Sequence, residues 1–128
     1  MKKSFVVTFC LFLLTIGQES NGQTYVCDYS NQCHYLPETD WQCQDKTPVY
    51  CTIVLNGNKT LLTVYSGNNS RTYSITSKEY YSDKKVWDFT VTNNSNNKQL
   101  IAKIDLSTNS ILFQDNNMLN AYHISEIK

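Results

Sequence analysis

Apolar and polar residues alternate with a period of two over most of the chain after residue 47, and short polar segments interrupt this pattern. Because successive side chains of a β-strand point to opposite faces, such alternation predicts strands with one buried face. The first of these segments places four side chains on one face: Val49, Cys51, Ile53 and Leu55. Asn56-Gly57-Asn58 follows it and predicts a hairpin turn, because Asn-Gly readily adopts positive φ angles.

The same pattern predicts six more strands, which are separated by turns rich in Asn, Ser, Asp and Gly. Their ranges are 61–65, 71–75, 87–91, 100–106, 111–113 and 119–127. The segment 77–85 is polar and carries Tyr80 and Tyr81, and we expect a loop or a ragged sheet edge there. No segment shows the i, i+3, i+4 spacing of an amphipathic helix over a useful length.

About seven strands joined by short loops indicate an all-β fold in which each strand is antiparallel to the next. Short loops also favour an up-and-down meander over Greek-key crossovers. Such a meander either curls into a small barrel or packs as a sandwich, and we favour the curled sheet or small barrel. The predicted architecture is lipocalin-like, although the Gly-x-Trp mark of that family is absent near the first strand.

The N-terminus has the pattern of a secretory signal peptide over residues 1–22. Two lysines form a positive region, and residues 5–16 form an apolar run that is too short to span a bilayer as a helix. Ser20 and Gly22 are the small residues that a cleavage site after residue 22 requires, and an uncleaved anchor is the alternative. We therefore expect one secreted β-rich domain over residues 23–128, which is extracellular, or periplasmic in a bacterium.

Four cysteines lie within a cysteine-rich segment, residues 23–51: Cys27, Cys33, Cys43 and Cys51. An even number in a short exported chain predicts two disulfides, but four cysteines allow three pairings and the spacing does not choose among them. Zinc is disfavoured, because no two cysteines have the close C-x2-C spacing of structural zinc sites. Since Cys51 shares the predicted core face, a disulfide from it would tie residues 23–47 over the sheet as a plug or lid.

The charge of the chain is balanced, with 11 basic and 11 acidic residues. This balance provides no basic patch of the kind that binds nucleic acid or an anionic membrane. We therefore expect a monomer whose partner is a protein or a glycan, with no nucleic acid and no membrane contact after signal cleavage. We expect neither a cofactor nor a metal.

No residue pattern identifies a reaction, and we assign no catalytic residue. His34 and His123 are the only imidazole bases, and neither a nucleophile elbow nor a phosphate-binding loop occurs. Glu38 and Asp40 are two carboxylates beside Trp41 in the cysteine-rich segment. A glycosidase needs its two carboxylates on either side of a sugar site rather than in one short loop. The sequence therefore favours a protein without enzymatic activity.

Two sets of side chains are candidates for binding. A surface set combines the acidic loop with two tyrosines: Glu38, Asp40, Trp41, Tyr80 and Tyr81. Tyr65 and Tyr73 would extend this aromatic surface, because tyrosine offers rigid area with a polar tip. A second set would share one face, where it lines a ligand cavity or fills the core: Trp87, Phe89, Val91, Leu100, Ile104 and Tyr122.

These features favour a secreted, non-enzymatic binding or interaction domain of unknown specificity. One alternative is a carrier that holds a small apolar ligand in a lipocalin-like cavity, and retained ligand would distinguish it. The other alternative is an enzyme inhibitor or small hydrolase that acts through the cysteine-rich loop. Loss of activity on mutating Glu38, Asp40 and Trp41, with folding intact, would support that alternative.

Overall fold

The computed structural model describes residues 22–128, and residues 1–21, which make up nearly all of the predicted signal peptide, lie outside the described residues. The described chain consists of antiparallel strands joined by short connections. Its strands are β1 (Gln23–Leu36), β2 (Asp40–Cys43), β3 (Thr47–Leu55), β4 (Leu61–Ser66), β5 (Asn69–Tyr81), β6 (Val86–Asn93), β7 (Gln99–Asp105), β8 (Ser110–Gln114) and β9 (Met118–Ile127).

Strand β1 closes the sheet into a barrel, because it pairs with β3 along one edge and with β9 along the other. From β3 to β9 each strand is antiparallel to the next, so β1 and β3 to β9 form a closed wall of eight strands. At the seam, the Thr24 amide donates to the Lys128 carbonyl at 3.3 Å and the Lys128 amide donates to the Thr24 carbonyl at 2.8 Å. The prediction of an antiparallel meander curled into a small barrel is confirmed.

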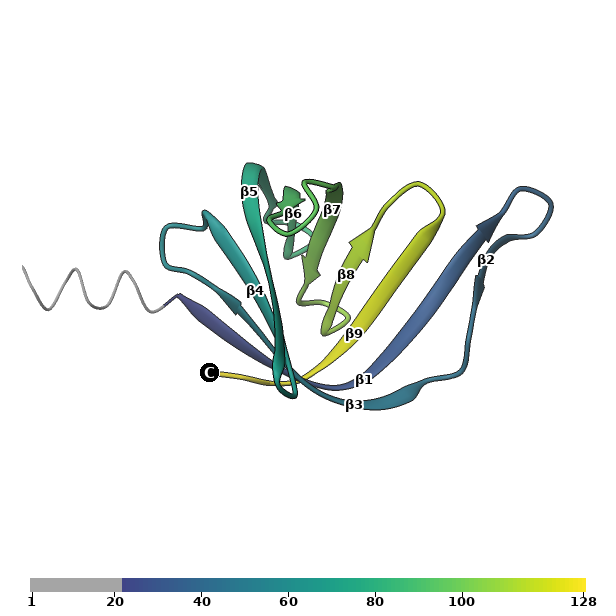
Figure 1. Ribbon diagram of the computed structural model, residues 1–128, viewed down its shortest axis with the longest axis horizontal. Coiled ribbons are helices and arrows are strands. Elements are labelled where there is room, and N and C mark those ends of the chain that lie inside the picture. Colours follow the sequence, from purple (N-terminus) through teal and green to yellow (C-terminus); the bar gives the residue numbers. More distant parts are fainter. Residues whose placement is uncertain (1–21) are drawn as a thin grey trace, which may run out of the picture.

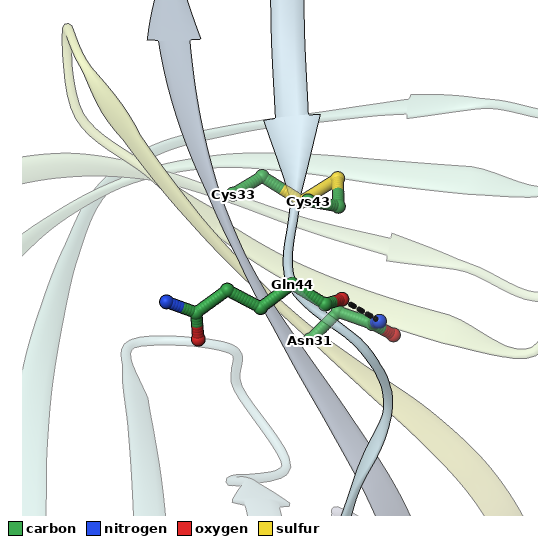
Figure 2. Close-up of a disulfide and its surroundings, with 4 residues drawn as sticks. All are labelled: Asn31, Cys33, Cys43 and Gln44. Atoms are coloured by element: carbon green, nitrogen blue, oxygen red, sulfur yellow. Dashed lines mark hydrogen bonds between the residues drawn. A yellow bond between two sulfur atoms is a disulfide. The ribbon is translucent and has the colours of Figure 1, made fainter.

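The hairpin formed by β1 and β2 lies next to β9, on the right of Figure 1, and β1 stays paired with β9 as far as His34. A disulfide joins Cys33 of β1 to Cys43 of β2, which lie directly opposite one another in the strand register. Just beyond β2, the Asn31 side chain donates a hydrogen bond to the Gln44 carbonyl at 3.0 Å (Figure 2). The hairpin is therefore fixed by a covalent bond and a side-chain hydrogen bond at the end of β2.

Residues 23–47 do not form the plug or lid that we expected. They form β1, which belongs to the closed wall of the barrel, β2, which extends that wall as a hairpin with β1, and the first residue of β3. Period-two alternation does not reveal β1, because its register shifts against both neighbours around Cys27 and Tyr29. Such irregularities move the side chains that follow to the opposite face, and this breaks the alternation.

The loop expected over residues 77–85 is shorter than predicted. Strand β5 continues to Tyr81, and only the four residues from 82 to 85 separate it from β6. The register of β5 against β6 shifts between Ile75 and Ser77, so Thr76 is an extra residue in β5. Inward side chains therefore have odd numbers before Thr76 and even numbers after it. This change breaks the alternation, so the sequence of the second half of β5 does not read as a continuation of the first half.

Apolar side chains fill the interior of the barrel. The largest fully buried ones come from β3, β4 and β6 to β8: Ile53, Leu55, Leu62, Phe89, Ile104 and Ile111. Within residues 22–128, no polar or charged residue is buried. An eight-stranded barrel has an interior just wide enough for side chains to fill it. The centre of this barrel is accordingly a packed hydrophobic core.

Aspartate carboxylates hold two of the turns. Asp105 accepts hydrogen bonds from the Ser107 hydroxyl at 2.6 Å and from the Ser107 amide at 3.0 Å. Asp115 accepts hydrogen bonds from the amides of Asn117 at 3.0 Å and Met118 at 2.8 Å. Because these bonds favour the ionised form, they hold the pKa of both carboxyl groups below the usual range.

Replacement of a core aromatic residue tests the packed interior. Phe89→Ala should lower the free energy of unfolding by about 3–5 kcal/mol, because it removes a buried ring and leaves a cavity. Urea unfolding followed by circular dichroism measures the change. Tyr50→Ala is the control, since Tyr50 is 88% exposed. The control should change stability by no more than about 0.5 kcal/mol, and equal losses in the two variants would contradict the packed core.

The aspartate turns predict a loss of stability in acid. The pKa of Asp105 and of Asp115 in the folded protein lies below the unfolded value of about 3.9. The two ionised carboxylates therefore contribute fully to the free energy of unfolding above that value, and this contribution is lost as the pH falls through the folded pKa. The urea midpoint should therefore fall between about pH 5 and pH 2, and it should fall less in the Asp105→Asn/Asp115→Asn variant. An identical fall in the variant would show that other groups cause the acid loss.

Candidate functional site

Arg71 lies at one mouth of the barrel and points toward its axis. It is opposite Val64 in the register of β4 and β5, and Val64 is buried in the core, so the two side chains share the inward face. The strand begins only two residues earlier, at Asn69, and this places Arg71 near the end of the barrel. Its guanidinium donates a hydrogen bond to the Tyr122 hydroxyl at 3.3 Å, which connects β5 with β9.

Aromatic side chains line the same cavity as this cation. The rings of Tyr73 and Phe113 stack with their centroids 5.1 Å apart, and Phe113 meets Tyr122 edge-on at 6.0 Å. Tyr73 is two residues beyond Arg71 on the same inward face of β5, and it is buried. The mouth therefore combines a positive charge with an aromatic wall contributed by β5, β8 and β9.

A cavity of about 170 Å³ opens at this mouth, and its lining includes Arg71, Lys98, Phe113, Asn120 and Tyr122. A second, wider hollow of about 750 Å³ adjoins it and shares Lys98 and Asp115 with it. The ammonium group of Lys98 lies 3.4 Å from the Asp115 carboxylate. This ion pair joins the β6–β7 connection to the β8–β9 connection, so it forms part of the rim between the two hollows.

The electrostatics keep Arg71 positively charged. Burial disfavours its charge, but coulombic interactions with Tyr73 and Tyr122, together with the Tyr122 hydrogen bond, hold the pKa of Arg71 above its usual value. Burial raises the pKa of Tyr73, so this phenol stays neutral in the physiological range. No carboxylate within residues 22–128 forms an ion pair with Arg71. Asp115 is the carboxylate in the lining of this cavity, and it pairs with Lys98, so the cation of Arg71 is left without a direct acidic partner among the described residues.

The second set of candidate residues does share the inward face. The strand register pairs Trp87 with Ile104 and Val91 with Leu100, and it pairs Tyr122 with buried Ile111. Phe89, Val91 and Ile104 are packed in the core, and the Trp87 ring stacks on Phe89 at 5.5 Å. Only two members of the set, Leu100 and Tyr122, also line the cavity at the mouth.

The surface set lies in two separate places. Glu38 and Asp40 are exposed at the tip of the β1–β2 hairpin, and Trp41 meets Tyr35 edge-on at 5.4 Å. Tyr80 and Tyr81 are at the end of β5, which is the opposite end of the barrel, because β1 and β5 run in opposite directions. The five residues therefore do not form one binding surface.

The aromatic surface that we expected from Tyr65 and Tyr73 is also divided, because Tyr73 is buried in the barrel. Tyr65 is half-exposed and belongs to a row of outward tyrosines on β1, β3 and β4. Tyr29 lies opposite Pro48 of β3, and Tyr65 lies opposite Thr52 of β3. Tyr50 lies between Pro48 and Thr52 in the sequence and on the same face of β3. We call Tyr29, Tyr50 and Tyr65 the outer tyrosine row.

The two histidines are both on the outside of the described chain. The Nδ1 atom of His123 lies 2.8 Å from the Oδ1 atom of Asp28, and both side chains are about half-exposed. His34 is exposed on the part of β1 that pairs with β2. Residues 22–128 hold no cluster of three His, Cys, Asp or Glu side chains that could bind a metal ion.

Pattern analysis of the sequence did not identify Arg71 as a site residue. The alternation of the sequence could have identified it, because Arg71, Tyr73 and Ile75 are separated by polar residues and so belong to one face of the strand. A charged residue at an inward position near a strand end is a candidate for the mouth of a barrel.

No family model, no curated protein and no solved structure matches this chain. Among the described residues there is also no helix long and apolar enough to cross a membrane.

Proposed function

We propose that this protein is a secreted, non-enzymatic binding domain. The mouth of its barrel binds a small ligand that combines an anionic group with a single ring. The observation that carries the proposal is the cation of Arg71, which forms no ion pair with a carboxylate of the described residues and lines an open cavity together with Tyr73, Phe113 and Tyr122. Arginine binds carboxylate and phosphate through parallel hydrogen bonds, and the aromatic wall offers an apolar surface for the rest of the ligand.

The size of the cavity supports a ligand of one ring. Its volume of about 170 Å³ is close to that of an apolar cavity that accommodates benzene, which is about 150 Å³. The barrel is also compatible with the lipocalin-like carrier that the sequence suggested. A carrier of a larger apolar ligand would need space at the centre, and there Phe89, Val91 and Ile104 are packed together. The mouth is therefore the better-supported site.

Export to an oxidising compartment is part of this proposal. The Cys33–Cys43 disulfide is consistent with an extracellular location, since disulfides persist outside the reducing cytosol. The outer tyrosine row is a second candidate surface, because Tyr50 is 88% exposed and flat aromatic side chains favour glycan or protein contacts. The inhibitor or hydrolase alternative gains no such support from the exposed Glu38 and Asp40.

A titration followed by NMR tests the mouth. Benzoate and glucuronate are the anionic probes, and benzyl alcohol and glucose are their neutral counterparts. We expect an anion to shift the signals of Arg71 and Tyr122, and Arg71→Gln to weaken its binding about tenfold or more, because a hydrogen bond to a charged group contributes about 1.5–3 kcal/mol. Arg71→Lys should retain part of the affinity, because it retains the charge.

Lys103→Gln is the matched control, because it removes a cation that pairs with Asp88 on the outside of the barrel, 3.9 Å away. This variant should bind both probes as the wild type does. Equal binding of neutral and anionic probes, or no effect of Arg71→Gln, would contradict the proposal. Shifts confined to Tyr50 and Tyr65 on addition of glucuronate would instead assign binding to the outer tyrosine row.

A further inference from the structure

Two buried cysteines face one another across β1 and β3. Cys27 and Cys51 are directly opposite in the register of these antiparallel strands, and both point into the core. They are only 2% and 1% exposed, and each carries a free thiol in this structure. Because directly opposite residues of antiparallel strands that share a face are close neighbours, the two side chains lie next to one another in the core.

The backbone at this pair suits a disulfide. Directly opposite residues of antiparallel strands have Cα atoms about 4.5–5.5 Å apart, and disulfides span Cα distances of about 4.4–6.8 Å. The same relation already carries a disulfide elsewhere in the chain, because Cys33 and Cys43 are also directly opposite, in β1 and β2. Strand β1 thus faces a cysteine in each of two neighbours.

We infer that Cys27 and Cys51 are the site of a second disulfide, which links β1 to β3 and encloses the Cys33–Cys43 disulfide in a nested arrangement. Each of the two other pairings would need Cys33 or Cys43 to leave its opposite partner in the β1–β2 hairpin. The strand register therefore selects one of the three pairings that the sequence leaves open.

The bond forms by two exchange steps with a small disulfide such as glutathione disulfide. The thiolate of one of the two cysteines, Cys27 or Cys51, attacks the disulfide, displaces one glutathione thiolate and forms a mixed disulfide. The thiol of the other cysteine then loses its proton and displaces the second glutathione. The protein loses two electrons and two protons, and one glutathione disulfide becomes two glutathione thiols.

Burial determines when this reaction takes place. Since both sulfurs are almost inaccessible in the closed barrel, an oxidant reaches them only before β1 is enclosed between β3 and β9. Once formed, the disulfide is protected from reductants by the same packing. Oxidation is therefore coupled to folding, and the folded oxidised protein should resist reduction until it is unfolded.

Peptide mapping of the full-length secreted protein tests the pairing directly. After unfolding without reductant, the protein is treated with iodoacetamide and cut with a protease that cleaves before aspartate. Cleavage before the aspartates at 28, 40, 45 and 83 places the four cysteines in four different peptides. The first peptide ends at Cys27, and the others are 28–39 with Cys33, 40–44 with Cys43 and 45–82 with Cys51. We expect that none of these four cysteines is alkylated. The peptide that ends at Cys27 should be linked to peptide 45–82, and peptide 28–39 should be linked to peptide 40–44.

Alkylation of Cys27 and Cys51, or linkage of either one to Cys33 or Cys43, would overturn the inference. A second measurement uses the Cys33→Ala/Cys43→Ala variant, in which the inferred disulfide is isolated. Refolding with glutathione disulfide should remove two hydrogens from its mass and raise its Tm by on the order of 10 °C relative to the reduced form. In the Cys27→Ala/Cys51→Val variant, the same treatment should oxidise only the Cys33–Cys43 pair. Retention of both thiols in the first variant after refolding would also contradict the inference.

Discussion

The pairing of β1 with both β3 and β9 is the constraint on which the rest of this structure depends. Without it, β3 to β9 would be an open meander with two unpaired edges, and unpaired edges expose backbone amides and carbonyls to other chains. Closure removes those edges and gives the sheet a single interior. It also joins the two ends of the described chain, because Thr24 and Lys128 exchange backbone hydrogen bonds at the seam. Apolar side chains from eight strands then share one core.

Closure also explains where the candidate chemistry lies. The interior is filled by side chains such as Phe89 and Ile104, so polar groups on the inward face find room only near the strand ends. Arg71 is such a group, and the rings of Tyr73, Phe113 and Tyr122 come from strands that closure brings around it. Both cysteine pairs involve β1, the strand that closes the barrel. The Cys33–Cys43 disulfide restricts the unfolded chain at this strand, within a loop of ten residues, whereas the pairing with distant β9 depends on backbone hydrogen bonds.

The sequence predicts the seven strands from β3 to β9 and their up-and-down order, because alternation and Asn-rich turns are local signals. It does not predict β1, whose role depends on β9 at the other end of the chain and whose irregular register obscures its alternation. The end of β5 is missed for the same reason, since Thr76 changes the parity of inward positions. Of the candidate residues, the inward set is recognised as one face, but the sequence does not show that only Leu100 and Tyr122 reach the mouth. Arg71 is missed because its inward position is informative only once the barrel is known to close.

The most direct test of this account is NMR detection of contacts between β1 and β9 in the purified protein. Nuclear Overhauser effects between backbone protons should connect Ser30 with Tyr122, Gln32 with Asn120 and Thr24 with Lys128, in addition to those between β1 and β3. The amides of Thr24 and Lys128 should also exchange slowly with solvent. Contacts between β1 and β3 without any between β1 and β9 would show an open curled sheet, and would contradict both the closed interior and the mouth that depends on it.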